Sequence, residues 1–208
     1  MAEIAPTRSA ALALADEREL MRQGYRFLDE KRVLLASEML RRLREHERMH
    51  AGLVERLYAA HDALRSALQR HGLDGMQAHP AASIAPASPQ PVRARFLGVP
   101  VLSTDFAPKT IEGAEAAIDA SPEAGACRDA FAALLEPLAR LGVSGGNLER
   151  LAVEYRRTER RARALENVLL PEVEGALSTI QGQLELADQE EAVRIRLASF
   201  AHASAPAL

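Results

Sequence analysis

The sequence predicts an all-α protein, a long antiparallel two-helix coiled coil with a small region of irregular chain, β-hairpin and short helices at one end. Residues 7–72 and 147–200 repeat leucine and alanine at alternating three- and four-residue intervals, the spacing of coiled-coil helices. Prolines interrupt the chain between these segments. Aromatic residues form only 4% of the chain, so aliphatic residues must supply the core, as in long helices. We therefore expect residues 1–208 to form one extended domain in which the terminal helices pair.

The N-terminal helix is expected over residues 7–72. Thr7 follows Pro6 and can serve as the N-cap, and Gly72 and Gly75 provide a stop signal. Apolar residues recur at seven-residue intervals along this segment, which predicts a left-handed supercoil. The predicted seam residues of this helix are Leu14, Met21, Leu28, Leu35, Leu57 and Leu64.

The middle region covers residues 73–146 and is expected to be less regular than the helices. The prolines of the segment 76–91 predict an exposed loop. Alternating and β-branched residues over 92–102 then predict a short strand or a hairpin around the glycine of that segment. One or two short helices are expected to follow, and the glycines within residues 142–146 are expected to end them.

The C-terminal helix is expected over residues 147–200, followed by a flexible tail over 201–208. Pro171 lies inside this helix and lacks a backbone N–H, so it predicts a bend there. The apolar spacing lengthens to two four-residue steps between Leu169 and Leu177, which predicts a local relaxation of the supercoil. The predicted seam residues of this helix are Leu151, Leu165, Ile180 and Leu184.

Residues 46–50, His-Glu-Arg-Met-His, match the H-E-x-x-H motif of zinc peptidases. On a helix the two histidines share one face and could bind zinc, with Glu47 as the general base. The motif fixes only three positions, and Leu53 and Arg56 stand where the longer zinc-protease motif has glycine and a third histidine. The histidines also fall on the coiled-coil seam, where polar residues fix the register. We favour this second interpretation, expect no metal site, and keep a zinc metallopeptidase as a remote alternative.

Arginines crowd one stretch of the predicted C-terminal helix. Two interpretations stay open: a solvated helix face balanced by nearby glutamates, or a docking surface for an acidic partner. Fold-back pairing would bring a second arginine cluster, within residues 41–48, to about the same level. The candidate partner-binding residues are Arg156, Arg157, Arg160, Arg161 and Arg163.

Composition argues against several classes of function. The net charge of −3 gives no overall attraction to nucleic acid, and aromatic side chains for base stacking are scarce. Cys127 is the single cysteine, so no disulfide within the chain is expected. We find no phosphate-binding loop, no catalytic triad, no signal peptide and no apolar run of the roughly 20 residues that a membrane span needs. We therefore expect no catalytic residues, no cofactor, no nucleic acid partner and no direct membrane insertion.

Three segments resemble the D subunit of the V/A-type rotary ATPases. Residues 155–171, Tyr-Arg-Arg-Thr-Glu-Arg-Arg-Ala-Arg-Ala-Leu-Glu-Asn-Val-Leu-Leu-Pro, are similar to that family's R-R-T-x-R-R-V-N-A-L-E-x-V-x-I-P segment. Residues 24–28 with Lys31 resemble the family's N-terminal helix, and residues 96–101 resemble its hairpin region. The matching segments follow one another in the family's order over nearly the whole chain.

The resemblance implies a non-catalytic central-stalk protein, the rotor shaft of an ATPase or ATP synthase. Such a shaft couples ATP hydrolysis or synthesis in a catalytic hexamer to rotation of a membrane ring that carries H⁺ or Na⁺. The implied partners are the catalytic and non-catalytic hexamer subunits, a small globular stalk protein (F type) and a funnel-shaped protein (C/d type) on the membrane ring. The implied location is the cytoplasmic face of a bacterial membrane, reached through the complex. The alternative is a coiled-coil adaptor of a secretion, export or other hexameric ATPase.

Overall fold

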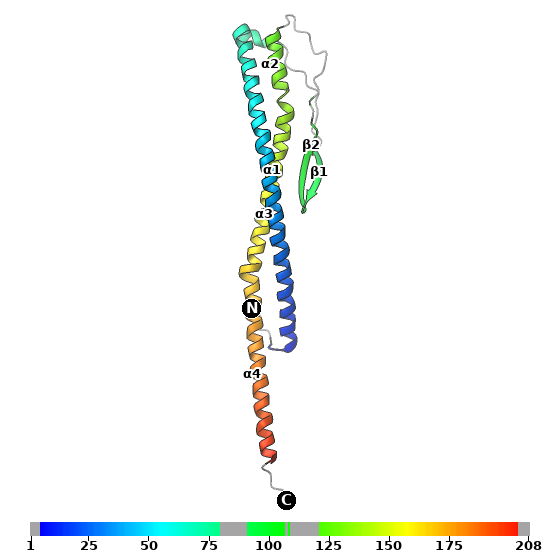
Figure 1. Cartoon of the computed structure of the whole chain (residues 1–208), viewed down its shortest axis with the longest axis vertical. Helices are drawn as coiled ribbons and strands as arrows, with labels where there is room; N and C mark the ends of the chain where they lie inside the picture. The colour runs from blue at the N-terminus through cyan, green and yellow to red at the C-terminus, as the bar shows by residue number, and fades with distance from the viewer. Residues whose placement is uncertain (1–4, 80–90, 107, 109–120, 204–208) are drawn as a thin grey trace. The chain divides into compact units, whose positions relative to one another are not determined.

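The computed structural model describes residues 5–79, 91–106, 108 and 121–203. Long helices dominate these residues, together with one small hairpin, which confirms the mainly α-helical class predicted from the sequence (Figure 1). The order of elements is α1 (Arg8–Gln77), β1 (Pro91–Phe96), β2 (Val99–Thr104), α2 (Pro122–Ala132), α3 (Leu135–Ala164), the π-helical turn η1 (Leu165–Leu169) and α4 (Leu170–Ala203).

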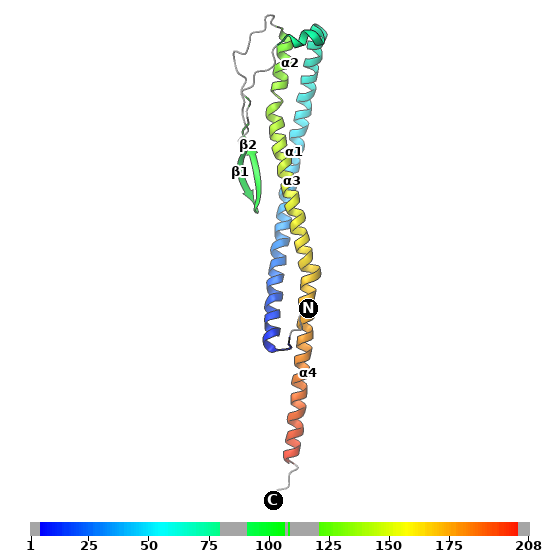
Figure 2. The ribbon, with the colours of Figure 1, turned by 180° about the vertical axis from the view of Figure 1, so that it is seen from behind.

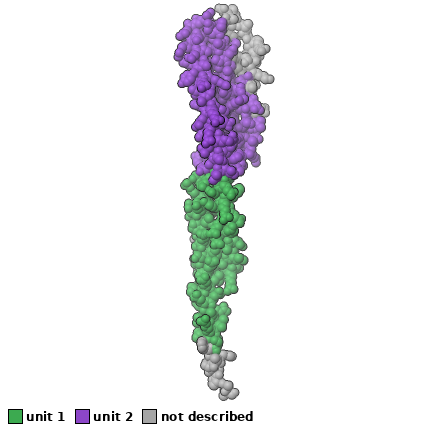
Figure 3. Space-filling model, viewed as in Figure 1, with its two compact units in different colours: residues 1–32, 157–208 green, residues 33–156 purple. Residues whose placement is uncertain are grey.

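The chain divides into two compact units, and α1 and α3 contribute residues to both (Figure 3). Unit 1 combines residues 1–32 with residues 157–208, and unit 2 comprises residues 33–156. Unit 1 therefore joins an N-terminal segment to a C-terminal segment, as the predicted pairing of the terminal helices requires, and unit 2 is one continuous stretch of the chain.

Unit 1 pairs the first turns of α1 with α4 in an antiparallel arrangement. Arg8 Nη2 lies 3.0 Å from a carboxylate oxygen of Asp188, and Arg22 Nη2 lies 2.7 Å from one of Glu174, so the order of contacts along the two helices is reversed. These exposed ion pairs contribute little to stability. Most of the stabilisation comes from apolar side chains between the helices, which are Leu14, Val173, Leu177 and Ile180, with Met21 and Leu184 partly buried beside them.

Unit 2 packs the remainder of α1 against α2 and the first half of α3. Leu35 and Leu151 are fully buried and form a core with Val99 of the hairpin. Further along α1, the small residues Ala60 and Ala67 are completely buried, which allows a close approach of the helix backbones. Ser121 caps the N-terminus of α2 by accepting a hydrogen bond from the N–H of Ala124, and it also lies 2.6 Å from His71 Nε2.

Of the two forms predicted over residues 92–102, a short strand or a hairpin, the structure has the hairpin. Its strands are antiparallel, with Phe96 opposite Val99 at the turn. Leu97 and Gly98 connect them with φ values of 48° and 88°, both in the left-handed region, as in a type I′ turn. Opposite views place β2 nearer the helices and β1 on the outer side of the hairpin (Figures 1 and 2).

Of the glycines predicted to end helices, Gly72 breaks the regular helix, and those within residues 142–146 do not. Gly72 has a non-helical backbone with a φ of 69°, which kinks α1 at the predicted end, and a short helical stretch follows it to Gln77. α3 begins at Leu135 and runs without interruption through the glycines within residues 142–146. The intrinsic helix penalty of a glycine is about 1 kcal/mol, which packing against a neighbouring helix outweighs. A Cβ added to Gly145 would lie 3.7 Å from the His46 ring, so this glycine lies directly against α1.

A π-helical turn, Leu165–Leu169, precedes the proline in the C-terminal helix. The N–H of Leu170 donates to the carbonyl of Leu165, five residues earlier, where an α-helix would use the fourth. Pro171 follows at once and has no N–H to place in the ladder. The bend predicted at Pro171 stays a prediction, but the structure places a local change of helix type directly beside it.

Most of the predicted loop and the end of the predicted tail lie outside the described residues. Residues 80–90 and 204–208 belong to this part of the chain, as do 109–120, where the short helices were expected to begin. α4 itself extends to Ala203, beyond the predicted helix end at residue 200.

Candidate functional site

The exposed arginines near the end of α3 form the first candidate surface, called here the arginine band: Arg156, Arg157, Arg160, Arg161 and Arg163. All five side chains are exposed. Thr158 and Ala162, one helical turn apart, are each only 2% exposed, because they face α1. This inward pair fixes the orientation of the helix and leaves the neighbouring arginines on the outside.

The arginines of the band differ in their partners within the chain. Arg163 donates to Glu159 at 2.7 Å, and Arg156 donates to the carbonyl of Ala152 at 3.2 Å. Three members have no hydrogen bond or ion pair from their side chains to any described residue, namely Arg157, Arg160 and Arg161. Their charges are therefore available to an acidic partner.

The second arginine cluster does not lie opposite the band as the sequence suggested. In unit 1, Gly24 lies against Leu165, and in unit 2, His46 lies against Ser144. Residues 41–48 therefore lie beside the part of α3 near Ser144. The expectation from sequence placed the partner of residues 41–48 too far along the chain, because it began this helix at Asn147 instead of Leu135.

Glu38 neutralises part of this second cluster. Its carboxylate accepts hydrogen bonds from Arg41 at 2.7 and 2.8 Å and from Arg42 at 2.6 Å. The hydrogen bond from Arg41, supported by that from Arg42, lowers the pKa of Glu38 from its ordinary value of 4.5 to about 2. These two arginines are therefore engaged within α1.

An apolar groove in unit 2 is the second candidate surface, and the sequence analysis missed it. It has a volume of about 510 Å³, and a single charged residue, Glu149, lies among its lining residues. Leu40 and Leu43 in its wall remain 55% and 42% exposed. The sequence signal for this groove was the position of these leucines beside the predicted seam. An apolar stripe that is wider than one coiled-coil seam indicates that the helix contacts a second neighbour. The other lining residues are Ala36, Met39, Leu148, Ala152 and Tyr155.

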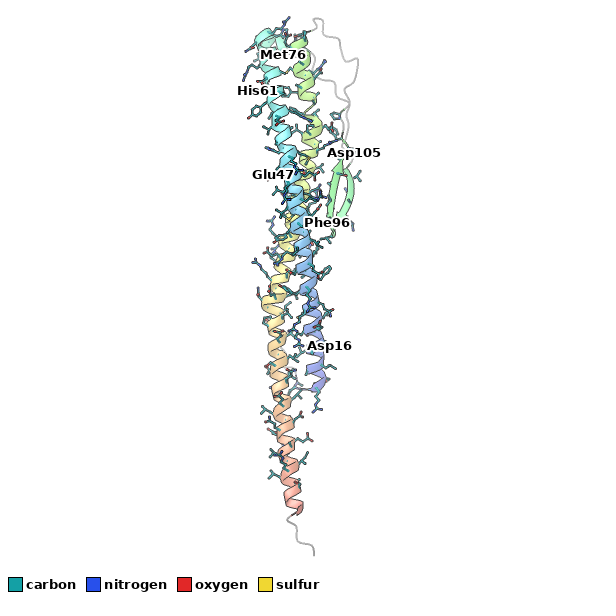
Figure 4. All side chains as sticks on the ribbon, in the orientation of Figure 1. Asp16, Glu47, His61, Met76, Phe96 and Asp105 are labelled. Carbon is teal, nitrogen blue, oxygen red and sulfur yellow. The ribbon has the colours of Figure 1, made fainter. Side chains whose placement is uncertain are left out.

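The H-E-x-x-H residues do not form a metal centre with other described residues. His46 Nδ1 lies 3.3 Å from Ser144 Oγ and faces α3, whereas Glu47 and His50 are exposed. Figure 4 labels Glu47 on α1. Within the described ranges, no group of three or more histidine, cysteine, aspartate or glutamate side chains could hold a metal ion. Cys127 is buried in α2 as a free thiol.

The predicted seam residues divide by burial. Leu14, Leu35, Leu151 and Ile180 are buried, and a second group is half-buried: Met21, Leu28, Leu64, Leu165 and Leu184. Leu57 differs from the prediction because it is 51% exposed. Ala60, three residues later, faces the neighbouring helix in its place, so the contact stripe has rotated away from Leu57.

The fold and its exposed surfaces define a helical, paired-helix protein with surfaces suited to protein partners. None of the described helices has both the length and the apolar character that crossing a bilayer requires. The sequence profile of the ATP synthase D subunit family matches residues 10–199. The chain therefore belongs to the family of ATP synthase D subunits.

Individual relatives come from bacteria and archaea. The D subunit of a V-type ATP synthase from Anaeromyxobacter dehalogenans (strain 2CP-1) is 34% identical over 94% of this chain and 95% of its own length. The V-type D subunit of Thermotoga neapolitana is 26% identical over 93% and 95%, respectively. The D subunit of an A-type ATP synthase from Methanopyrus kandleri is 27% identical over 93% of this chain and 84% of its own.

Proposed function

We propose that this chain is the non-catalytic central-stalk protein, or rotor shaft, of a V/A-type rotary ATPase or ATP synthase. The observation that carries the proposal is the match to the D subunit family over residues 10–199. The antiparallel helix pairing within each unit supports it, because two paired helices resist bending and twisting better than one. In this role the chain works as one extended domain and couples ATP hydrolysis or synthesis to H⁺ or Na⁺ transport.

The coupling is conformational in this proposal. A single asymmetric shaft inside a ring of chemically identical sites presents a different surface to each site, so its angle biases which site is closed. Nucleotide turnover then turns the shaft, and the shaft turns the membrane ring. The chain itself would contribute no catalytic group and would reach the cytoplasmic face of the membrane only through its partners.

The proposed partners are the catalytic and non-catalytic hexamer subunits, a small globular stalk protein (F type) and a funnel-shaped protein (C/d type) that joins the membrane ring. The arginine band suits an acidic surface on one of them. The apolar groove suits an amphipathic helix of another, because its walls come from neighbouring segments of α1 and α3 with apolar side chains.

Co-expression with the hexamer subunits encoded by the same genome tests the role. Size-exclusion chromatography with mass determination should give one copy of this chain for each hexamer of three catalytic and three non-catalytic subunits, because an axial component breaks the threefold symmetry. Binding in multiples of three, or no binding, would contradict the shaft and favour the adaptor of another hexameric ATPase.

A further inference from the structure

The two edges of the β-hairpin differ in their hydrogen bonds to the rest of unit 2. On β2, the Asn147 side chain accepts from the N–H of Leu102 at 2.8 Å and donates to its carbonyl at 2.7 Å. Arg150 Nε donates to the carbonyl of Pro100 at 3.1 Å, and Pro100 has no N–H. The outward backbone groups of β2 from Pro100 to Leu102 are thus all satisfied by α3.

The register shows which backbone groups of β1 point outward. Arg93 is opposite Leu102 and Arg95 is opposite Pro100. Because both backbone groups of Leu102 bind Asn147, the Arg93–Leu102 pair is one of the pairs without ladder hydrogen bonds. Such pairs alternate along an antiparallel ladder, so the N–H and C=O groups of Arg93 and Arg95 both point away from β2.

These outward groups of β1 are open. Arg93 and Arg95 are both exposed, and no described residue donates to or accepts from their outward backbone groups. The strand itself is held in place, because Val99 and Val101 of its partner strand are only 4% and 7% exposed. A rigid, unpaired strand edge is a template for strand addition, and its rigidity reduces the entropy that binding must remove.

Charge restricts what can occupy this edge. The side chains of Arg93 and Arg95 lie on the face opposite the buried valines, since residues two apart in a strand share a face. A second copy of β1 paired antiparallel would set these arginines against each other, which is unfavourable. A strand with acidic side chains at alternate positions would instead pair with them. We propose that β1 is a docking edge for an extended segment of a partner protein with acidic residues at alternate positions.

Hydrogen exchange on the full-length chain tests this proposal with a short peptide in which glutamate alternates with valine. At saturation, exchange of the Arg93 and Arg95 amides should slow by about tenfold or more, because the bound fraction protects them. The same peptide with lysine in place of glutamate should have no effect. Unchanged exchange with the glutamate peptide at saturating concentration, or equal protection by both peptides, would overturn the proposal.

Two variants separate the contribution of the backbone edge to binding from the contribution of the arginine charge. Arg95→Pro removes the outward N–H without touching the ladder to β2 and should abolish protection, whereas Arg95→Gln should weaken it. Protection of the Leu102 amide reports whether the hairpin remains docked in each variant, and Arg65→Gln on α1 is the matched control. If the chain self-associates and Arg95→Pro removes this self-association, the edge binds a second copy of the chain, and the proposal of an acidic partner is overturned. The test does not depend on the rotor role.

Discussion

At the scale of single residues, Glu38 shows how one carboxylate can organise a cationic stretch of helix. Its side chain is only 12% exposed and receives hydrogen bonds from two arginines in the next turn of α1. A carboxylate held in this way stays ionised in the fold at a pH where a free glutamate would be protonated. The contribution to stability must therefore depend on pH.

The sign of this dependence follows from the direction of the shift. The pKa of Glu38 is about 2 in the folded chain and near 4.5 in the unfolded chain, so its contribution is complete above pH 4.5 and is lost as the pH falls through 2. We expect Glu38→Gln to lower the free energy of unfolding by about 1 kcal/mol at neutral pH, since Arg41 is partly exposed. The difference should shrink toward about pH 3.

Urea unfolding at both pH values measures this effect, with Glu55→Gln, at an exposed position of the same helix, as the control. An equal loss of stability at both pH values would contradict the assignment of the effect to ionised Glu38.

At the scale of elements, the π-helical turn and the proline that follows it act as a pair. A π turn contains one residue more than the α-helical turn it replaces. Removing one residue there would restore an ordinary α-helix and keep the downstream seam, whose buried members are Val173, Leu177 and Ile180. It would also place Pro171 inside a regular helix, where its ring meets the carbonyl four residues earlier.

We therefore predict that deleting Val168, a half-exposed residue of the turn, destabilises unit 1 by about 3 kcal/mol, the cost of an interior proline. Pro171→Ala in the same chain should recover most of this loss. Thr179 is exposed and lies in sequence between two buried residues of the seam. Its deletion should destabilise unit 1 more, and Pro171→Ala should not recover the loss, because the deletion rotates the helix beyond it by about 100°. Thermal unfolding of each deletion with and without Pro171→Ala measures the coupling between turn and proline.

If the deletion of Val168 leaves the thermal stability unchanged while Pro171 is present, the π-helical turn is not needed to accommodate the proline.

The helices and their pairing were predictable because their signal is periodic and local. The four-residue steps from Leu169 through Leu177 indicated an irregularity next to the π-helical turn, but such steps fit a relaxed supercoil as well as a π turn. The glycines within residues 142–146 misled the prediction, since propensity does not reveal that His46 packs against Gly145. The apolar groove and the capping of Leu102 by Asn147 were not predictable, because both depend on contacts between segments far apart in the sequence.

At the scale of the whole molecule, each unit has its own apolar core, and the exposed charges remain for partners. The arginine band is the clearest case, because three of its five side chains have no partner among the described residues. Exposed charges of this kind contribute little to folding stability and more to recognition and association rate.

Charge reversal of the band tests its role in assembly. We expect Arg157→Glu combined with Arg160→Glu to leave the thermal unfolding of the isolated chain nearly unchanged, because both side chains are exposed. The affinity for the rest of the complex should fall by about tenfold or more. The matched control reverses Arg65 and Arg128, which are exposed elsewhere on the chain. Unchanged assembly, ATPase rate and coupling in the band variant would refute the docking role.

The clamp between Asn147 and Leu102 also determines how the hairpin responds to ionic strength. Both of its hydrogen bonds join neutral amide groups, and Asn147 is only 3% exposed, so dissolved ions screen them little. The ion pairs of Arg8 and Arg22 across unit 1 are exposed and weaken as salt is added. Concentrated salt should therefore loosen the surface contacts between the helices of unit 1 while the hairpin stays attached to α3.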